Sequence, residues 1–264
     1  MKPFHQGKQT LRLVCRDSLD YPIHLQDAVE IIFVLEGESV ALYEKKRISL
    51  SSGNLFVAFP GRIHGFTESR GIRAYVFIIP RELVSSLMGM DPEGKFPRNP
   101  SPALSVEERD ELSLIMNLAF KNWALGTKPL REGYTAVLLS KILPLLSLQA
   151  EERVSSSALA LVMRYINEHY KESLSRRSIA DAVGYHESYL SHLFCENLGK
   201  SLSDYVLSLR LADAADLLEN TRESISTIAL SLGFGSIRSF NRAFLKETGL
   251  SPSAYRHQKG EEKK

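Results

Sequence analysis

The sequence has little cysteine and no long apolar run, and both absences narrow the class of protein. Only two cysteines occur in 264 residues, Cys15 and Cys195, and they lie far apart in the chain. This spacing argues against a disulfide framework and favours a reducing compartment. No apolar run approaches the roughly 20 residues that a membrane-spanning helix needs, and the N-terminus lacks a cleavable apolar signal. We therefore expect a cytoplasmic protein with no membrane partner.

A strong net charge is also missing. The chain carries 33 Lys and Arg against 31 Asp and Glu, and its 44% apolar content is that of an ordinary soluble globular protein. Its length is enough for two domains, each with its own core. From residue 157 to the end there are 14 Lys and Arg against 13 Asp and Glu, a net charge of only +1. A nucleic-acid site in this half must therefore depend on where its cations lie.

What the sequence does contain is a short internal repeat. The segment that begins at Ile179 reads IADAVGYHESYLSHLF, and the segment that begins at Ile228 reads IALSLGFGSIRSFNRAF. The apolar and glycine positions of the first segment recur 49 or 50 residues later in the second, which has one extra residue in its turn. A repeat this short indicates two copies of one supersecondary unit rather than a solenoid.

Each copy has the pattern of a helix-turn-helix. Ala180 and Gly184 lie four residues apart on one face of a short first helix, where small residues let a second helix cross closely. Ser175 and Ser226 are the predicted N-caps of the two first helices. The second helices are predicted to bury apolar stripes formed by Leu190, Leu193 and Phe194 in copy one and by Phe240, Ala243 and Phe244 in copy two. Such a second helix is the one that enters a DNA major groove.

The opposite, polar face of each second helix holds the candidate DNA-binding residues. These are Ser188, Ser191 and His192 in copy one, and Ser236, Ile237, Arg238, Asn241, Arg242 and Lys246 in copy two. Arg238, Arg242 and Lys246 follow one another at intervals of four residues and form one basic stripe. On an isolated helix, such a stripe would be interpreted as a face exposed to solvent. Within a duplicated helix-turn-helix we assign Arg238 to a guanine edge and Arg242 to a neighbouring base or phosphate. Ser236 is predicted to cap its helix beside a phosphate, and Ile237 to contact a thymine methyl group.

The stretch from about 157 to 257 resembles the DNA-binding domain of the AraC/XylS family of bacterial transcription regulators. Motifs that carry the resemblance include Ile179-Ala180, Gly184-Tyr185, Leu193-Phe194, Gly199-Lys200-Ser201, Leu209-Arg210, Ile228-Ala229, Gly233-Phe234, Gly249 and Ser251-Pro252. It covers two-fifths of the chain and implies two helix-turn-helix motifs, at about 175–197 and 224–248. One departure concerns the first copy, where His192, Cys195 and Glu196 stand at positions that usually carry Arg and Lys in the family.

Residues 1 to about 82 are predicted to form strands. Short runs rich in β-branched and aromatic residues occupy 11–14, 29–35, 39–43, 54–59 and 73–79, with turns at 36–38 and 52–54. Several short strands with regular turns suggest a barrel or jelly roll. The segment from Glu30 to Gly37 and the segment from Gly53 to His64 resemble the cupin-type sensor domain that precedes many AraC-family DNA-binding domains. The predicted fold class is α+β, with a cupin-like N-terminal barrel and an all-α C-terminal part.

Four residues of this N-terminal part are candidates for a ligand pocket: His24, Gln26, Glu30 and His64. A metal-binding cupin would offer three histidines and one glutamate, whereas this chain has Gln26 at the place of one histidine. An amide is a poor ligand for Fe, Zn or Ni, and the two histidines could equally be core residues or line an organic-ligand pocket. We expect no metal and no cofactor, and favour a small-molecule pocket at the mouth of the barrel.

Two amphipathic helices are predicted after a loop at 85–103. Ser105 and Glu108 have the spacing of a capping box that opens the first, and Pro144 is predicted to kink the second, which runs from about 130 to 151. The family resemblance implies that one of these helices forms a dimer interface. A polar linker at 151–157 would separate a sensing and dimerisation domain, 1–152, from the DNA-binding domain, 153–264. There, helices are predicted at 158–170 and, as a rigid connection between the copies, at 203–220.

The favoured hypothesis is a sequence-specific transcription regulator that is not an enzyme. It would bind double-stranded DNA and a small-molecule effector and would form a homodimer, with RNA polymerase as a further candidate partner. The alternative is a cupin-type metal-dependent enzyme with an appended helical domain. That alternative has an incomplete ligand set and leaves the duplication unexplained. A pure protein-interaction module, as a third hypothesis, predicts no salt-sensitive DNA binding.

Overall fold

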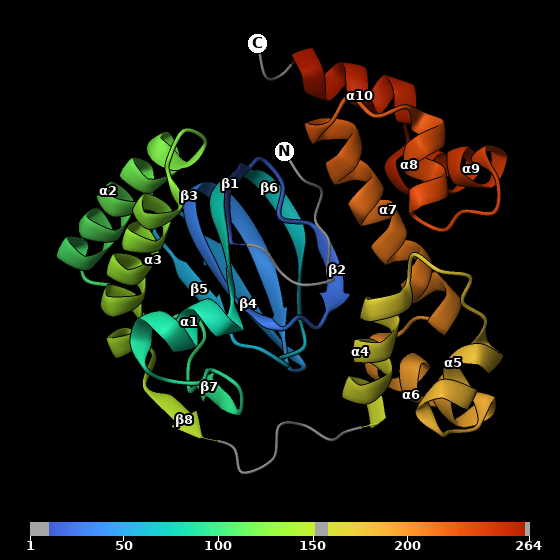
Figure 1. Ribbon diagram of the computed structural model, residues 1–264, viewed down its shortest axis with the longest axis horizontal. Coiled ribbons are helices and arrows are strands. Elements are labelled where there is room, and N and C mark those ends of the chain that lie inside the picture. The colour runs from blue at the N-terminus through green and yellow to red at the C-terminus, as the bar shows by residue number, and fades with distance from the viewer. Residues whose placement is uncertain (1–10, 151–157, 262–264) are drawn as a thin grey trace. The chain divides into compact units, whose positions relative to one another are not determined.

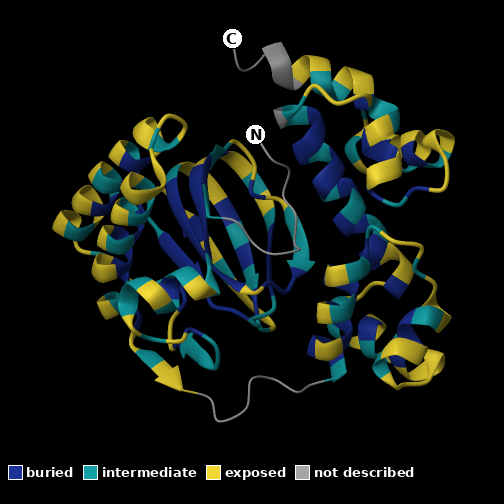
Figure 2. Cartoon of the chain, viewed as in Figure 1, coloured by how far each residue is buried: buried dark blue, intermediate teal, exposed yellow. Residues whose placement is uncertain are grey.

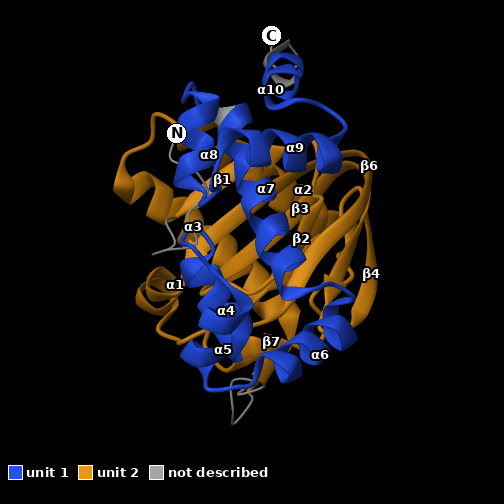
Figure 3. Ribbon diagram, turned by 90° about the vertical axis from the view of Figure 1, so that its right-hand side faces the viewer, with its two compact units in different colours: residues 1–7, 161–264 blue, residues 8–160 orange. Residues whose placement is uncertain are grey.

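A computed structural model describes residues 11–150 and 158–261 of the chain (Figure 1). The described residues divide into two compact units, the first ending at Ala160 and the second beginning at Leu161, which are coloured separately in Figure 3. The first is an antiparallel β-sheet with helices, and the second is helical. The predicted domain boundary and the predicted linker at 151–157 lie outside the described residues. No helix in the described ranges is both long enough and apolar enough to cross a membrane.

The sheet of the N-terminal unit is organised around two long antiparallel strands, β3 and β6. Its strands are β1 (Arg12–Arg16), β2 (Tyr21–His24), β3 (Ala28–Tyr43), β4 (Lys46–Ser51), β5 (Leu55–Ala58) and β6 (His64–Pro80). Strands β3 and β6 pair along most of their lengths. Each long strand has two short partners: β6 pairs with β1 at one end and β2 at the other, and β3 pairs with β5 and β4 in the same way. The sheet therefore has two halves that share β3 and β6.

Between the two halves, β3 passes through a bulged segment rather than a turn. Its pairing with β6 shifts in register three times between Val34 and Val40. Gly37 has a φ of 75°, and a Cβ there would lie 2.2 Å from the carbonyl oxygen of Gly71, so only glycine fits. The predicted turn at 36–38, with separate strands on either side, is wrong. The residues that are typical of a turn form β-bulges here, and these bulges bend the strand without ending it.

The sheet folds over on itself at this bend. Phe56 lies opposite Ile32 and Phe66 lies opposite Ala41, positions that a straight β3 would hold about 30 Å apart. Yet the ring centroids of Phe56 and Phe66 are 5.4 Å apart. The two halves thus enclose an apolar interior between them, and Glu30 of β3 is buried there because it shares a face with Ile32.

The other face of β3 is covered by helices. Val29, Ile31 and Phe33 belong to one buried cluster with residues of α1 (Arg81–Met88), α2 (Val106–Trp123) and α3 (Lys128–Ile142). The predicted capping box at the start of α2 is confirmed, since the hydroxyl of Ser105 accepts the N–H of Glu108 and the Glu108 carboxylate accepts the N–H of Ser105. Leu112, Met116 and Ala119 of α2 and Leu139 of α3 are buried, whereas Val137 of α3 is exposed.

Two predictions about this region are wrong. The second helix does not continue to 151: α3 ends at Ile142, a 3-10 turn η1 follows at Leu143–Leu146, and strand β8 (Leu148–Ala150) pairs with β7 (Lys95–Pro97). Pro144 lacks an N–H and its ring clashes with the preceding helical turn, so it ends the α-helix rather than kinking it. The predicted loop at 85–103 contains the second half of α1 and all of β7.

The C-terminal unit consists of seven helices in the described residues. They are α4 (Ala158–His169), α5 (Arg176–Val183), α6 (Glu187–Leu198), α7 (Leu202–Asn220), α8 (Ile225–Ser231), α9 (Ile237–Thr248) and α10 (Pro252–Glu261). The predicted pairs α5–α6 and α8–α9 are present, joined by α7 as one continuous helix. Of the predicted core stripes, Leu190, Phe194, Phe240 and Phe244 are fully buried, and Leu193 and Ala243 are partly buried. The helices of this unit carry both buried and exposed residues in Figure 2. In α4, Leu161 is exposed and Met163 is buried.

Local capping explains where these short helices begin and end. Ser175 caps α5 by accepting the N–H of Ser178 at 3.0 Å, and Gly184 ends that helix with a φ of 73°. The cap of α8 is Ser224, whose hydroxyl accepts the N–H of Thr227 at 3.0 Å, and not Ser226 as predicted. Ser226 lies inside the first turn, where its own backbone is already helical.

Candidate functional site

Helix α9 carries the predicted basic stripe on its solvent face. Ser236 caps the helix as predicted, with its hydroxyl accepting the N–H of Ser239 at 3.1 Å. Arg238, Arg242 and Lys246 are exposed. Across the described ranges, no ion pair or hydrogen bond engages these three side chains, so their charges are available to a partner.

The rest of the predicted contact set in the second copy lies beside this stripe. Ser236, Ile237 and Asn241 are exposed together with the three cations, while Phe240 and Phe244 anchor the opposite face in a buried cluster. The exposed fraction of Ile237 is 42%, which is high for an isoleucine. Helix α9 thus presents cations, an amide and one apolar side chain on a single outward face.

Helix α6 of the first copy differs from α9 in charge. Its sequence, ESYLSHLFCENL, contains no Lys or Arg. Ser188 and His192 are exposed, but the hydroxyl of Ser191 donates to the backbone carbonyl of Glu187 in its own helix at 2.9 Å. Glu187 and Glu196 are exposed at its two ends. The two recognition helices are therefore unequal in their electrostatic attraction for a phosphate backbone.

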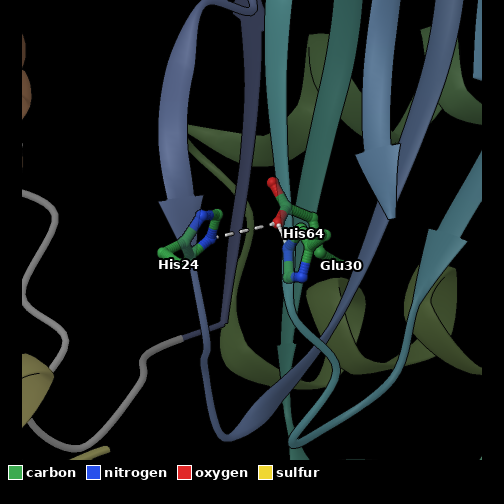
Figure 4. A group of neighbouring side chains, drawn as sticks. All are labelled: His24, Glu30 and His64. Atoms are coloured by element: carbon green, nitrogen blue, oxygen red, sulfur yellow. Dashed lines mark hydrogen bonds and ion pairs between the residues drawn. The ribbon is translucent and has the colours of Figure 1, made fainter. Parts of the chain in front are cut away.

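Three titratable side chains of the N-terminal unit meet in the interior of the sheet (Figure 4). His24 ends β2, Glu30 lies near the start of β3, and His64 begins β6. Their exposed fractions are 2%, 5% and 0%. Nε2 of His64 is 2.8 Å from a carboxylate oxygen of Glu30, and Nε2 of His24 is 3.8 Å from the same oxygen.

Backbone carbonyls fix the tautomers of both histidines. Nδ1 of His24 lies 3.0 Å from the carbonyl oxygen of Pro22, and Nδ1 of His64 lies 2.8 Å from that of Arg62. A carbonyl oxygen only accepts, so each Nδ1 carries a proton and donates it. Each Nε2 therefore faces Glu30, and Nε2 of His64 is within hydrogen-bond distance of its carboxylate. In the part of the chain that the structure describes, Nε2 of His24 has no hydrogen-bond partner.

Burial and neighbouring groups shift the pKa values of His24 and Glu30 in this cluster. Burial, together with the adjacent His64, lowers the pKa of His24 to about 3, so this imidazole is neutral near pH 7. Burial by itself would raise the pKa of Glu30, but the hydrogen bond and charge of His64 outweigh it and hold the pKa of this carboxyl below its usual value. The cluster accordingly combines a carboxylate with imidazole nitrogens, which is a donor set for a cation.

The structure brings together all four residues that the sequence analysis singled out, but it gives Gln26 a different role. The side-chain amide of Gln26 donates to Glu30 at 2.8 Å, so this residue orients the carboxylate. The contributions of Pro22 and Arg62 were missed, because they act through their backbone carbonyls and no side-chain pattern marks them.

Comparisons with known proteins identify the helical unit. Residues 179–258 match the family model of a helix-turn-helix domain. The chain is 35% identical over 107 residues to YobQ, an HTH-type transcriptional regulator of Bacillus subtilis (strain 168), covering 40% of this chain and 44% of YobQ. The C-terminal unit belongs to the AraC-type helix-turn-helix family. YijO, an HTH-type transcriptional regulator of Escherichia coli (strain K12), is 37% identical over 124 residues, covering 47% of this chain and 44% of YijO.

Longer matches extend beyond the AraC-type domain. YfiF, an HTH-type transcriptional regulator of Bacillus subtilis, is 25% identical over 248 residues, 89% of this chain and 78% of YfiF. The matches to YobQ and YijO, by contrast, span less than half the length of either protein. All three relatives are named as HTH-type transcriptional regulators.

Solved structures of ToxT from Vibrio cholerae share the fold of the whole chain. An apo structure of a ToxT variant has a TM-score of 0.58 at 13% identity, covering 94% of this chain and 96% of that one. ToxT with a bound unsaturated fatty acid has a TM-score of 0.55 at 14% identity, covering 94% of both chains. At such low identity the likeness concerns the fold alone: a β-sheet unit followed in sequence by an AraC-type domain.

Proposed function

We propose that this protein is a sequence-specific DNA-binding transcription regulator. The observation that carries the proposal is the exposed, unpaired stripe of Arg238, Arg242 and Lys246 on the second helix of a duplicated helix-turn-helix. Cations placed this way on a recognition helix neutralise phosphates and reach base edges in the major groove. The regulators matched by sequence support the same conclusion, and an enzyme would leave the duplication without a role.

Contacts to DNA are assigned by chemistry within this proposal. Arg238 contacts a guanine edge, Arg242 a neighbouring base or phosphate, and Asn241 suits an adenine. The first turn of α9, capped by Ser236, presents free backbone amides to a phosphate. Helix α7, with 19 residues, is about 28 Å long, and as one continuous helix it is suited to act as a rigid connection between the two copies. Ser188, Ser191 and His192 complete the contact set from α6.

The N-terminal unit, taken as 1–152, is proposed to sense an effector. Its folded-over sheet supports a cupin-like barrel whose interior holds His24, Gln26, Glu30 and His64. The likeness to ToxT, which has an unsaturated fatty acid bound in one of its structures, supports a role for this fold in taking a small ligand. The DNA-binding domain would then be 153–264, and the regulator would act in the cytoplasm.

Dimerisation is proposed to use the outward faces of α2 and α3. Leu114 and Leu118, four residues apart on α2, are 61% and 44% exposed, and Leu130 and Val137 of α3 are also exposed. Apolar side chains at helical spacing on an outer face are typical of a protein interface. A second copy of this chain is the partner that the family resemblance implies.

The DNA-binding part is tested with the full-length protein and an operator selected from random sequence. We expect affinity to fall steeply as the salt concentration rises. Each phosphate that the protein neutralises steepens the slope of log K against log salt concentration by about 0.9. Replacing Arg238, Arg242 and Lys246 together by Ala should abolish specific binding, whereas Arg164→Ala, an exposed arginine of α4, should not. Binding that ignores both salt and the stripe would contradict the proposal.

Sedimentation tests the dimer. The double variant Leu114→Glu and Leu118→Glu should convert a dimer into a monomer, because two carboxylates would be desolvated in the interface. Leu161→Glu is a matched control, since Leu161 is a leucine of the other unit with an exposed fraction of 45%. A wild-type protein that is monomeric at micromolar concentration would refute the proposed interface.

A further inference from the structure

The buried cluster of the N-terminal unit contains a polar atom that its surroundings do not explain. Nε2 of His24 is enclosed and, within the described ranges, has no hydrogen-bond partner, although it points toward Glu30. Buried polar groups in folded proteins are nearly always paired, so an exception needs a reason. Here the lone pair of His24, the carboxylate of Glu30 and Nε2 of His64 converge from three different strands (Figure 4).

We infer that the N-terminal unit binds a divalent transition-metal ion through Nε2 of His24, Nε2 of His64 and a carboxylate oxygen of Glu30. Zn²⁺, Fe²⁺ and Ni²⁺ are the class of ion that takes two imidazoles and one carboxylate. The site goes beyond the DNA-binding function proposed above. The further step, that this ion is the effector, rests on that proposed function.

The distances fit such an ion after small movements. Ligand atoms about 2.0–2.2 Å from a common metal ion are separated by about 3.0–3.5 Å. The two histidine nitrogens lie 2.8 and 3.8 Å from the Glu30 oxygen, and the donor atoms of the three residues all lie within 4.8 Å of one another. Side-chain shifts of about 1 Å would bring all three to bonding distance.

The orientation of the two imidazoles is already that of metal ligands. In metal sites the ring nitrogen that does not bind the metal usually donates to a carbonyl or carboxylate, which fixes the tautomer. Both histidines do so here, each to the carbonyl oxygen two residues earlier, at Pro22 and at Arg62. The same local geometry at two separate strand ends holds both Nε2 atoms toward the interior.

Glu30 makes the site suited to a cation rather than to an organic acid. Its carboxylate oxygen accepts a hydrogen bond from Gln26 and lies 2.8 and 3.8 Å from the two imidazole nitrogens, so an anionic head group would be placed beside an acid in an interior of low dielectric constant. A metal ion would instead give the free lone pair of His24 a partner. The chemistry of the donors therefore favours a metal ion at this cluster.

Gln26 explains why a missing third histidine does not remove the site. Its amide donates to Glu30 and acts outside the ligand set, as groups that orient metal-binding carboxylates do. Three protein ligands with at least one further position open to water or a small molecule are a common arrangement for Zn²⁺ and for Fe²⁺. Within the described residues, this is the group of His, Cys, Asp and Glu side chains that is close enough to hold an ion.

Titration of the full-length, tag-free, chelator-treated protein with Co²⁺ tests the inference. We expect one Co²⁺ per chain, with visible absorption bands that report nitrogen and oxygen ligands, and a Tm that rises with Co²⁺ concentration. Glu30→Gln and His64→Gln should each weaken binding by at least about tenfold.

Gln26→His adds an imidazole next to Glu30 and should tighten binding and change the spectrum. His169→Gln removes a half-exposed His169–Glu172 pair of the other unit and should change nothing.

Several outcomes would overturn the site. The first is that the wild-type protein binds neither Co²⁺ nor Zn²⁺. The second is that both variants, Glu30→Gln and His64→Gln, still bind one Co²⁺ per chain. Since either substitution could unfold the unit, circular dichroism of each metal-free variant is required, and the gain expected for Gln26→His cannot arise from unfolding. Unchanged affinity together with an unchanged Co²⁺ spectrum in Gln26→His would place the ion elsewhere. Binding of oleate in the absence of any Co²⁺ binding would assign the cluster to an anionic ligand.

DNA binding with and without Co²⁺ separates this inference from the proposed function. An effector role predicts that Co²⁺ changes operator affinity in the wild type but not in Glu30→Gln. Intact Co²⁺ binding in a protein that binds no DNA would refute the regulator and leave the metal site standing. Salt-sensitive operator binding in a protein that binds no metal would refute the metal site alone.

Discussion

Arg210 of α7 is hydrogen-bonded to Gly233 in the turn of the second helix-turn-helix, with Nη1 donating to the Gly233 carbonyl at 2.8 Å. The same guanidinium donates from Nε to the carbonyl of Tyr170 and from Nη2 to that of Glu172, both at 2.7 Å. Tyr170 and Glu172 follow α4, on the side of the first copy. The planar, rigid guanidinium of Arg210 therefore links the turn of the second helix-turn-helix to the segment that follows α4. Helix α7 sets the distance between the copies, and Arg210 restrains their rotation.

Gly233→Ala should destabilise the domain more than Gly184→Ala. Both glycines adopt the left-handed backbone conformation, with φ of 78° at Gly233 and 73° at Gly184. Alanine therefore costs about 1–2 kcal/mol in backbone strain at either position. At Gly184 the added Cβ meets open space, but at Gly233 it would lie 2.3 Å from the carbonyl oxygen of Lys171. We expect a loss of about 1 kcal/mol for Gly184→Ala and at least about 3 kcal/mol for Gly233→Ala in urea unfolding followed by circular dichroism. Equal losses would show that the close approach is unimportant.

Asp213 predicts a pH dependence of stability in the same domain. Burial raises its pKa to about 6, although the ammonium of Lys171 at 3.2 Å and the hydroxyl of Tyr170 both favour the charged form. The folded-state pKa lies above the unfolded value, so the stability that Asp213 contributes is complete below about pH 4 and is lost as pH rises through about 6. The shift of about two units corresponds to about 3 kcal/mol.

The variant Asp213→Asn isolates this effect from other titrating groups. Asparagine keeps an oxygen that accepts the Tyr170 hydroxyl but cannot ionise. The difference in unfolding free energy between wild type and variant should therefore shift in favour of the variant between pH 4 and 7. A difference that stays constant over this range would mean that Asp213 ionises normally in the folded protein.

Much of the helical unit could be predicted because its signals are local. The caps at Ser175 and Ser236, the left-handed Gly184 and the buried faces of α6 and α9 depend on residues within one or two turns. The N-cap of α8 was predicted wrongly for an equally local reason. Ser224 and Ser226 are both good capping residues two positions apart, and only the backbone decides between them.

The sheet was less predictable because its shape depends on contacts distant in sequence. Glu36, Gly37 and Glu38 have turn composition, but the close approach of Gly37 to Gly71 keeps β3 continuous. The residues of the buried cluster were found by their types and spacing. Whether they could hold a metal ion was not predictable, because that depends on the directions of the two imidazoles, which the carbonyls of Pro22 and Arg62 set.

Arg238→Ala tests whether the basic stripe reads bases. An arginine that contacts a guanine edge contributes about 1–3 kcal/mol of discrimination. We therefore expect the variant to lose that much affinity for a selected operator and little for random DNA, in anisotropy titrations at one fixed salt concentration. Arg164→Ala, on α4, serves as the control for a change of net charge. Equal losses on both DNAs would reassign Arg238 to a phosphate contact.

The inequality of α6 and α9 leads to a prediction about salt dependence. Since α6 has no Lys or Arg, its side chains contribute few counterion-releasing contacts. The double variant His192→Arg and Glu196→Lys places two cations on α6, each able to reach a phosphate. Binding should tighten at moderate salt, and the slope of log K against log salt should steepen by up to about two units.

A control variant separates a local contact from a general gain of positive charge. Glu168→Lys alters an exposed residue of α4, away from both recognition helices in sequence, and should leave the slope nearly unchanged. Long-range attraction alone would steepen the slope in both variants, in proportion to the charge added. A flat response in the α6 variant would mean that α6 does not approach the DNA backbone. Helix α9 would then be the principal anchor on DNA, and the first helix-turn-helix would mainly support α7 and the guanidinium of Arg210.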